Sequence, residues 1–139
     1  MTIQPATEVH IDILLQHDRH ISETELRNLV SLGRVLVAEE DGDFRGWLRW
    51  NLFWDNTPFM NMLYVLEPYR GTGLGKELTR NWEENMKVQG YETVMTSTAS
   101  DEYAQHFYRK LGYETVGGFT LYGDPYELIL AKKLTGDTL

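Results

Sequence analysis

One stretch, from Phe59 to Lys76, constrains the fold of this 139-residue chain more than any other, because it reads as a strand, a glycine-rich turn and the start of a helix. Its first part, Phe59–Val65, is mostly apolar, which predicts a strand buried on both faces near the middle of a sheet. Glu67 and Pro68 end this strand. A helix is predicted from Leu74 to about Gln89, since apolar residues recur at helical spacing at Leu74, Leu78 and Trp82.

The turn between this strand and this helix has the composition of an anion-binding loop. Gly71, Gly73 and Gly75 alternate with other residues, so few side chains separate the backbone amides from a ligand. The amides lie at a predicted helix N-terminus, where the helix dipole and unpaired N–H groups favour a negative charge. The loop is therefore predicted to bind a phosphate, with an ordinary glycine-rich turn as the alternative.

Two other phosphate-binding loops do not fit this spacing. A P-loop has four residues between its first glycine and its Gly-Lys pair, which Ser or Thr follows, whereas Gly71 and Gly75 enclose three residues and Glu77 follows Lys76. A dinucleotide fingerprint would need its last glycine where Lys76 stands.

The pattern Arg70-x-x-Gly73-x-Gly75, after a strand ending Leu-Tyr-Val, resembles the acyl-CoA-binding motif of the GNAT family, the GCN5-related N-acetyltransferases. A second match lies downstream, where Ala104–Tyr113 reads AQHFYRKLGY and is similar to the family's late-helix pattern A-x-x-F-Y-x-K-L-G-F. With the general order of elements, the resemblance covers nearly the whole chain.

Composition sets further bounds. The length predicts a single domain over residues 1–139. The chain has no cysteine, which excludes disulfides and thiolate metal sites. A net charge of −8 argues against nucleic-acid binding and is compatible with a cationic substrate, although acidity also serves solubility. We find no basic-then-apolar leader and no apolar run near the roughly 20 residues of a membrane span, so a cytoplasmic protein is expected.

Periodicity and turn residues predict the remaining elements. Ser22 to Glu25 form a capping box that starts a helix ending before Gly33, and Asp41-Gly42 is a hairpin turn. An earlier helix carries Ile11, Leu14 and Leu15, and a later one begins near Asp101 as its N-cap. Strands are predicted at Thr2–Gln4, Arg34–Glu39, Phe44–Phe53, Thr93–Thr98, Tyr113–Leu121 and Tyr126–Lys132, with a loop at Asp55–Pro58. The fold class is α+β, a mixed, mostly antiparallel sheet of about six to seven strands with about four helices, in agreement with the GNAT fold.

The resemblance implies an acyl-CoA-dependent N-acyltransferase with acetyl-CoA as donor. The backbone of the loop would hold the pyrophosphate, through Arg70, Gly71, Thr72, Gly73, Leu74, Gly75 and Lys76. Strand backbone groups of Leu63, Tyr64 and Val65 would bind the pantetheine arm, and the Val65 amide would donate to the oxyanion.

Tyr108 corresponds to the family tyrosine that protonates the leaving thiolate, and its alternative is a core aromatic at helical spacing. A phenol's pKa of about 10 lies above a thiol's, about 8.5, so a dry site is needed for this role. Asp101 stands where many relatives carry an asparagine that contacts the pantetheine. An aspartate lacks the amide donor, which leaves capping as the other reading of Asp101.

No general base can be assigned. Asn61 on the central strand could orient a water but not accept a proton, and the acidic alternatives are Asp55, Glu67, Asp124 and Glu127. The aromatic set Trp47, Trp50, Phe53, Trp54 and Tyr64 is read either as core or as the wall of an acceptor pocket for an ammonium-bearing molecule. His10, His17, His20 and His106 lack metal-ligand spacing, so no metal is expected.

The acceptor is expected to be a small-molecule or peptide amine, and a homodimer is compatible with the aromatic-rich surface. Two rival functions stay open. The first is a non-catalytic acyl-CoA sensor, which would keep the Gly71–Lys76 loop but tolerate loss of Tyr108. The second is an unrelated nucleotide-phosphate binder, in which ATP or NAD would compete with CoA.

Overall fold

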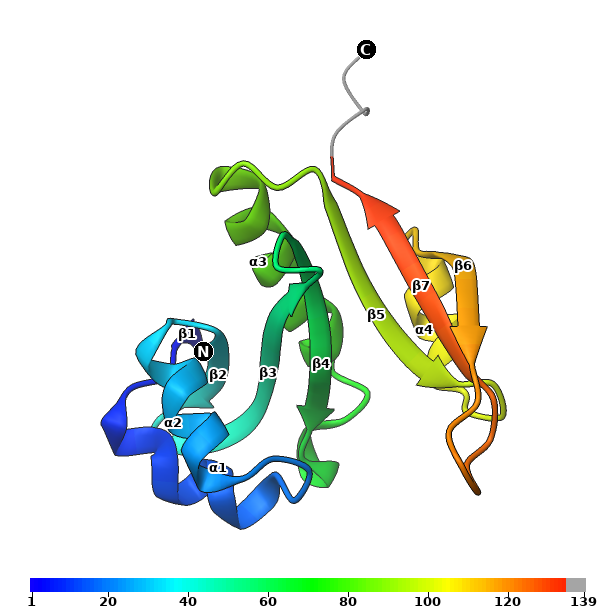
Figure 1. Ribbon diagram of the computed structural model, residues 1–139. Helices are drawn as coiled ribbons and strands as arrows, with labels where there is room; N and C mark the ends of the chain where they lie inside the picture. Colours follow the sequence, from blue (N-terminus) through cyan, green and yellow to red (C-terminus); the bar gives the residue numbers. More distant parts are fainter. Residues whose placement is uncertain (135–139) are drawn as a thin grey trace. The chain divides into compact units, whose positions relative to one another are not determined.

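The computed structural model describes residues 1–134, which form one seven-stranded sheet, four α-helices and two 3₁₀ turns (Figure 1). The strands run in the order β1-β2-β3-β4-β5-β7-β6. Their bounds are β1 Thr2–Pro5, β2 Val35–Glu40, β3 Asp43–Phe53, β4 Thr57–Val65, β5 Thr93–Ala99, β6 Glu114–Phe119 and β7 Glu127–Lys133. The helices are α1 Ile11–His17, α2 Glu23–Ser31, α3 Leu74–Val88 and α4 Ala104–Lys110, with turns η1 Glu8–His10 and η2 Glu67–Tyr69.

The sheet is mixed and mostly antiparallel, as predicted. β1 with β2, β2 with β3, and β7 with both β5 and β6 pair antiparallel. β4 and β5 pair parallel, through Phe59↔Met95 and Met60↔Thr96, because the whole of α3 separates them in the chain. None of the helices in the described part of the chain is long and apolar enough to cross a membrane.

The chain forms two compact units, Met1–Asn51 with Met62–Trp82, and Leu52–Asn61 with the chain from Glu83 onward. The core of the first unit packs α1 and α2 against β2 and β3. Its buried members are Ala6, Ile11, Leu14, Leu26, Leu29, Val35, Val37 and Trp47. This confirms the apolar face predicted for the first helix.

Local signals placed the boundaries of α2 and of the first hairpin. The Ser22 hydroxyl accepts a hydrogen bond from the Glu25 amide at 3.2 Å, and this bond caps α2. Gly33 follows with φ +73°, and the Arg34 amide closes the helix end on the Leu29 carbonyl. Asp41 and Gly42, at φ +53° and +82°, make the turn from β2 to β3 as predicted.

A charged pair is buried in the first unit. Asp18 is 2% exposed and accepts two bonds from Arg49, from Nε at 2.6 Å and from Nη2 at 3.3 Å, and a third from Trp47 Nε1 at 3.1 Å. The His20 amide completes its shell. Burial alone raises the pKa of Asp18, but the hydrogen bonds and charge of Arg49 outweigh it, so the pKa lies below the ordinary value.

In the second unit, alternate residues of β5 face opposite sides of the sheet. Thr96 is buried on the side that carries α4, close to Tyr108. Ala99 lies on the other side, opposite Glu127 of β7, which in turn lies opposite Phe119 of β6. One side of this part of the sheet therefore carries Thr96 and α4, and the other side carries Ala99, Glu127 and Phe119.

Three predictions about these elements were wrong. β4 is not buried on both faces, because Tyr64 is 42% exposed and Asn61 is exposed as well. The loop predicted at Asp55–Pro58 is shorter, because Thr57 and Pro58 already belong to β4. The turn consists of Trp54, Asp55 and Asn56, and its first two residues lie in the left-handed region, at φ +55° and +63°.

The third error concerns Asp101, which does not cap α4. The helix begins at Ala104 after Tyr103, without a side-chain cap. The preceding turn is held instead by Gln105, whose Nε2 donates to the carbonyls of Ser100 at 2.8 Å and Glu102 at 3.2 Å. Because these bonds fix the turn, the chain does not need a cap at residue 101.

Candidate active site

The loop after β4 is built by a sequence of tight turns. Pro68 lies in the 3₁₀ turn η2 (Glu67–Tyr69), after which the Arg70 amide donates to the Glu67 carbonyl at 3.2 Å. Gly71 and Gly73 then adopt φ +78° and +87°, values that side-chain-bearing residues rarely reach. Alternating left-handed residues turn successive N–H groups toward one side, the arrangement called a nest, which binds anions.

The amides of this loop are free to bind a ligand. Among residues 1–134, no acceptor is found for the backbone N–H groups of Gly71 through Lys76, and the first α3 bond inward is Glu77 N to Gly73 O at 3.0 Å. A Cβ placed on Gly71 or Gly73 would meet no atom within 4 Å, so the glycines leave open space beside the amides. Since α3 is 15 residues long, its dipole adds positive potential here. The arrangement fits a diphosphate.

Other loop residues hold this shape. Leu74 is 3% exposed and anchors the start of α3, while the Thr72 hydroxyl donates to the Tyr69 carbonyl at 2.7 Å. The Thr79 hydroxyl donates to Gly75 O at 2.9 Å. Lys76 is exposed, so its ammonium is available to a bound anion.

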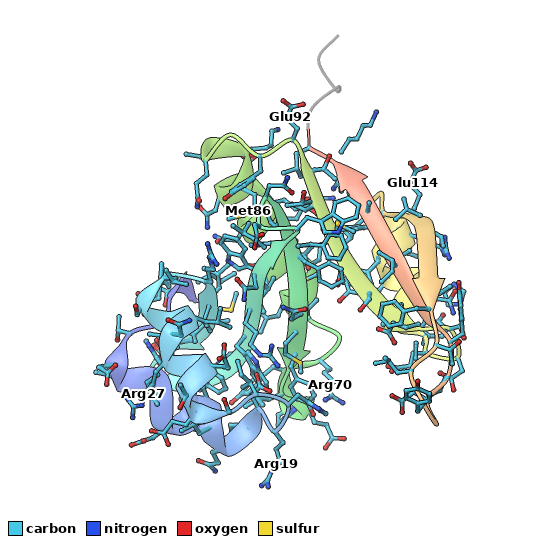
Figure 2. The ribbon with its side chains drawn as sticks, in the orientation of Figure 1. Arg19, Arg27, Arg70, Met86, Glu92 and Glu114 are labelled. Carbon is cyan, nitrogen blue, oxygen red and sulfur yellow. The ribbon has the colours of Figure 1, made fainter. Side chains whose placement is uncertain are left out.

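Arg70 turns back to the strand that precedes it. It lies just beyond the end of β4 (Figure 2), where its Nε donates to the Val65 carbonyl at 2.9 Å and its guanidinium covers the Tyr64 ring at 5.1 Å. The Val65 carbonyl thus already has a partner. Arg70 positions the strand end and the loop against each other within the first unit.

Gly46 is a residue at this strand end that sequence reasoning missed. A Cβ on it would lie 2.6 Å from the Tyr64 carbonyl oxygen, so only glycine lets β3 approach β4 this closely. Leu63 and Val65, on either side of Tyr64, are half-buried. A glycine inside an otherwise strong strand pattern was the available signal.

Tyr108 lies on α4 in the second unit and is 7% exposed. Its hydroxyl lies close to Thr96, whose Oγ1 donates to the Met60 carbonyl at 2.9 Å. Burial is the largest cause that raises the pKa of Tyr108 to about 12. The phenol therefore keeps its proton at neutral pH.

The candidate acids differ in their surroundings. Asp101 is exposed, Glu67 is exposed in η2, and Asp55 is exposed in the β3–β4 turn. Asp124 and Glu127 instead line a cavity in the β6–β7 loop. No group of three or more His, Asp or Glu side chains within the described residues is arranged to hold a metal ion.

Of the five aromatic residues that were predicted to be either core or the wall of an acceptor pocket, some are buried and others are exposed. Trp47 and Trp50 are core residues, 1% and 4% exposed. Tyr64, Phe53 and Trp54 are 42%, 37% and 79% exposed. Tyr64 stacks on Trp47 with ring centroids 5.0 Å apart, so the core continues to an exposed ring beside Arg70.

Comparison with known proteins gives a consistent answer. The model of the acetyltransferase (GNAT) family matches residues 6–113. Among solved structures, Ard1 from Thermoplasma volcanium superposes with a TM-score of 0.83 at 14% identity, covering 97% of this chain and 98% of that one. An aminoglycoside 6'-N-acetyltransferase complexed with coenzyme A gives 0.82 at 16% identity, with both chains covered completely. The ribosomal-protein-S18-alanine N-acetyltransferase from Escherichia coli gives 0.81 at 16%, covering 99% and 97%. No curated protein sequence matched.

The match spans most of the chain and includes both the glycine loop and Tyr108. A match to this family means that the activity is acyl-CoA-dependent N-acetyl transfer, with acetyl-CoA as the donor. The chain therefore belongs to the GNAT family of acetyltransferases.

Proposed function

We propose that the protein, as a single catalytic domain over residues 1–139, transfers acetyl from acetyl-CoA to a primary amine by direct attack. The observation that carries the proposal is the row of amides from Gly71 to Lys76 without acceptors at the start of α3. With no cysteine in the chain, a thiol-linked acyl-enzyme is not available. Direct attack is the simplest remaining route.

The donor is held along its length by backbone groups. The Gly71–Lys76 amides bind the diphosphate, and the exposed Lys76 ammonium adds charge. The pantetheine arm lies on the backbone of Leu63, Tyr64 and Val65, where Arg70 fixes the strand end. The Val65 amide donates to the developing oxyanion, an interaction that is worth roughly 10²-fold in rate.

The reaction then needs one bond formed and one broken. The nitrogen lone pair attacks the thioester carbonyl, the C–N bond forms, and the C–S bond breaks with its electron pair on sulfur. The amine proton leaves to water or a base, and the thiolate gains a proton. Tyr108 donates a hydrogen bond to that thiolate. Because its pKa of about 12 exceeds a thiol's of about 8.5, the phenol supplies this donor across the whole neutral range.

Replacing Tyr108 by phenylalanine is expected to lower kcat by about 10²-fold and to leave the CoA dissociation constant within about twofold. The reason is that the ring still packs in place while the donor is lost. Steady-state thiol release gives kcat, and calorimetry gives CoA affinity. Tyr103→Phe is the control, since that ring is 82% exposed just before α4. An unchanged kcat would remove Tyr108 from this role.

A panel experiment separates the enzyme from its two rivals. Thiol release is measured with acetyl-CoA and polyamines, aminoglycosides, amino acids and peptides beginning with alanine, since similar structures include acetyltransferases of aminoglycosides and of a ribosomal protein. Turnover of at least one amine is expected. CoA binding without any turnover would favour a sensor, and displacement of CoA by ATP or NAD would favour a nucleotide binder.

Two further properties belong to the same proposal. A cytoplasmic location gives access to acetyl-CoA. A homodimer is supported by the exposed apolar side chains at the edge strand β6 and its loop, Val116, Phe119, Leu121 and Tyr122. Light scattering at increasing protein concentration measures the oligomeric state, and a constant monomer mass would contradict the dimer.

A further inference from the structure

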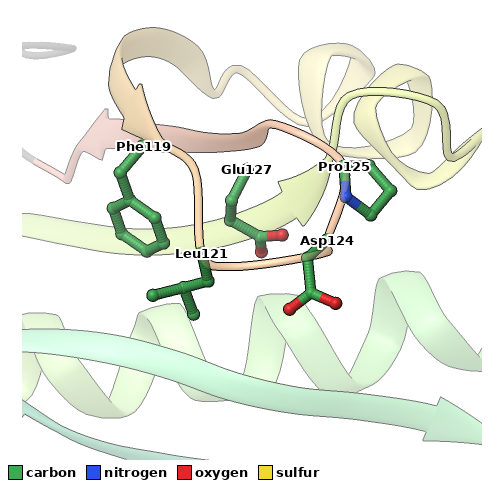
Figure 3. Close-up of a pocket in the computed structure, with 5 residues that line it drawn as sticks. All are labelled: Phe119, Leu121, Asp124, Pro125 and Glu127. Atoms are coloured by element: carbon green, nitrogen blue, oxygen red, sulfur yellow. The ribbon is translucent and has the colours of Figure 1, made fainter.

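Glu83 is a buried acid in the last turns of α3, and the proposed reaction does not use it. Its two carboxylate oxygens each accept one hydrogen bond, from the Tyr113 hydroxyl at 2.7 Å and from Lys132 Nζ at 2.9 Å. Glu83 and Tyr113 are 6% and 3% exposed, whereas the two acids of the β6–β7 loop line a cavity (Figure 3). Because a buried carboxylate is costly without partners, these bonds tie α3 to β7 and to the residue that precedes β6.

Tyr113 follows the end of α4 and contacts Tyr108 at two points. Its amide donates to the Tyr108 carbonyl at 3.1 Å, and the two rings meet edge to face with centroids 5.6 Å apart and 65° between their planes. Gly112, at φ +100°, makes the tight turn between the two residues. The hydroxyl of Tyr108 lies close to Thr96. The Tyr108 ring is therefore bounded by the Tyr113 ring and, at its hydroxyl, by Thr96.

Lys132 completes the shell of Tyr113 from β7. Its ammonium lies over the Tyr113 ring, 5.7 Å from the ring centre, while it donates to Glu83. Burial and then the charge of the Glu83 carboxylate raise the pKa of Tyr113, so its hydroxyl stays a donor at neutral pH. The ring that packs on Tyr108 is thus fixed at its hydroxyl and on its face, and Glu83 is the group that both contacts share.

From these contacts we infer that Glu83 is a positioning residue for acetyl transfer, which through Tyr113 fixes the place of the Tyr108 phenol. This inference rests on the proposed role of Tyr108 as hydrogen-bond donor to the leaving thiolate. A hydrogen bond weakens steeply with distance and angle, so a small displacement of the phenol lowers its contribution to the rate. The competing explanation is that Glu83 only ties α3 to β7, which affects stability but not the Tyr108 hydroxyl.

A double-mutant cycle on kcat separates these two explanations. Tyr113→Phe removes only the hydroxyl that Glu83 holds, and it is expected to lower kcat about fivefold and to leave the CoA dissociation constant within about twofold. In the Tyr108→Phe background the same change should lower kcat by less than about twofold, because the hydroxyl that it would misplace is absent. Tyr91→Phe removes another half-buried phenol of the second unit, and as the matched control it should leave kcat unchanged.

Two changes at position 83 test the acid itself. Glu83→Gln keeps an oxygen that accepts from the Tyr113 hydroxyl, so it should retain most of kcat. Glu83→Met has a similar size but no such oxygen, and it should lower kcat about fivefold when Tyr108 is present and less than about twofold in the Tyr108→Phe background. Equal losses in Glu83→Gln and Glu83→Met would contradict the hydrogen bond to Tyr113 as the cause.

Carbon NMR of protein labelled at the tyrosine Cζ atoms tests the placement without any reaction. The Tyr108 signal is assigned by its absence from Tyr108→Phe. It is expected to move in Tyr113→Phe and in Glu83→Met, and to stay in place in Tyr91→Phe. An unmoved signal, or a loss of kcat that is as large in the Tyr108→Phe background as in the wild type, would overturn the inference and leave acetyl transfer standing. A moved signal with unchanged kcat in Tyr108→Phe would refute the proposed role of Tyr108 but support the placement of its ring by Glu83.

Discussion

Substitution of both Gly71 and Gly73 by alanine is expected to weaken CoA binding by about 100-fold or more, with the protein still folded. Both residues have positive φ, where a Cβ costs about 1–2 kcal/mol each, and the added methyl groups would occupy the open space beside the loop amides. A backbone that relaxes away from positive φ also loses the convergence of its N–H groups. Calorimetric titration with CoA measures the effect.

Gly33→Ala is the matched control for this experiment. Gly33 has φ +73°, close to the +78° of Gly71, and lies in the same unit. A Cβ added to Gly33 would likewise meet no atom within 4 Å. The substitution should therefore have a similar backbone cost and leave CoA affinity unchanged. If all of the glycine variants lost stability alike and none lost CoA affinity, the loop would be an ordinary turn.

Removal of the Asp18 carboxylate is expected to have the largest effect on stability. Asp18→Ala leaves the Arg49 guanidinium, which is 6% exposed, and the Trp47 N–H without their acceptor in the core of the first unit. Breaking a buried pair by removing one partner costs about 3–5 kcal/mol, a large share of a typical domain's stability. Urea unfolding followed by tryptophan fluorescence measures the loss.

A double substitution tests whether the loss of stability comes from a buried charge left without its partner. Asp18→Leu combined with Arg49→Met removes both charges, and it should recover much of the stability that either single change loses. A double variant as unstable as the sum of the singles would show that the cost comes from packing alone.

The Asp18–Arg49 pair also predicts how the free energy of unfolding depends on pH. The pKa of Asp18 in the folded protein lies below its unfolded value of about 3.9, so its contribution is fully present above that value. It is lost as the pH falls through the folded pKa. Below about pH 4, the unfolding free energy of the wild type should therefore fall relative to that of the Asp18→Leu/Arg49→Met variant. Urea unfolding at pH 7, 4 and 3 measures this shift.

Much of the fold follows from local rules that the sequence displays. Ser22 caps α2 through the Glu25 amide, Asp41-Gly42 makes a turn with two positive φ values, and the loop glycines Gly71 and Gly73 adopt the left-handed region that glycine reaches without strain. In each case a few neighbouring residues suffice to set the backbone. The predicted upper limit of seven strands, the parallel pairing of β4 with β5 and the start of α3 are also confirmed.

Features that depend on distant partners could not be predicted. Asp18 reads as a surface acid after α1, and only the fold brings Arg49 to it, 31 residues away in the sequence. Thr96 and Tyr108 lie close together only because β5 and α4 pack against each other. Asp101 looked like an N-cap, but Gln105 fixes that turn and moves the helix start to Ala104. The roles of Leu63, Val65, Lys76 and Tyr108 in catalysis remain predictions.

A crystal structure of the protein with CoA tests the central claim most directly, namely that the backbone amides from Gly71 to Lys76 bind the diphosphate. The account predicts phosphate oxygens about 2.7–3.2 Å from several of these nitrogens, at the N-terminus of α3. A diphosphate bound elsewhere, with these amides facing only solvent, would contradict it.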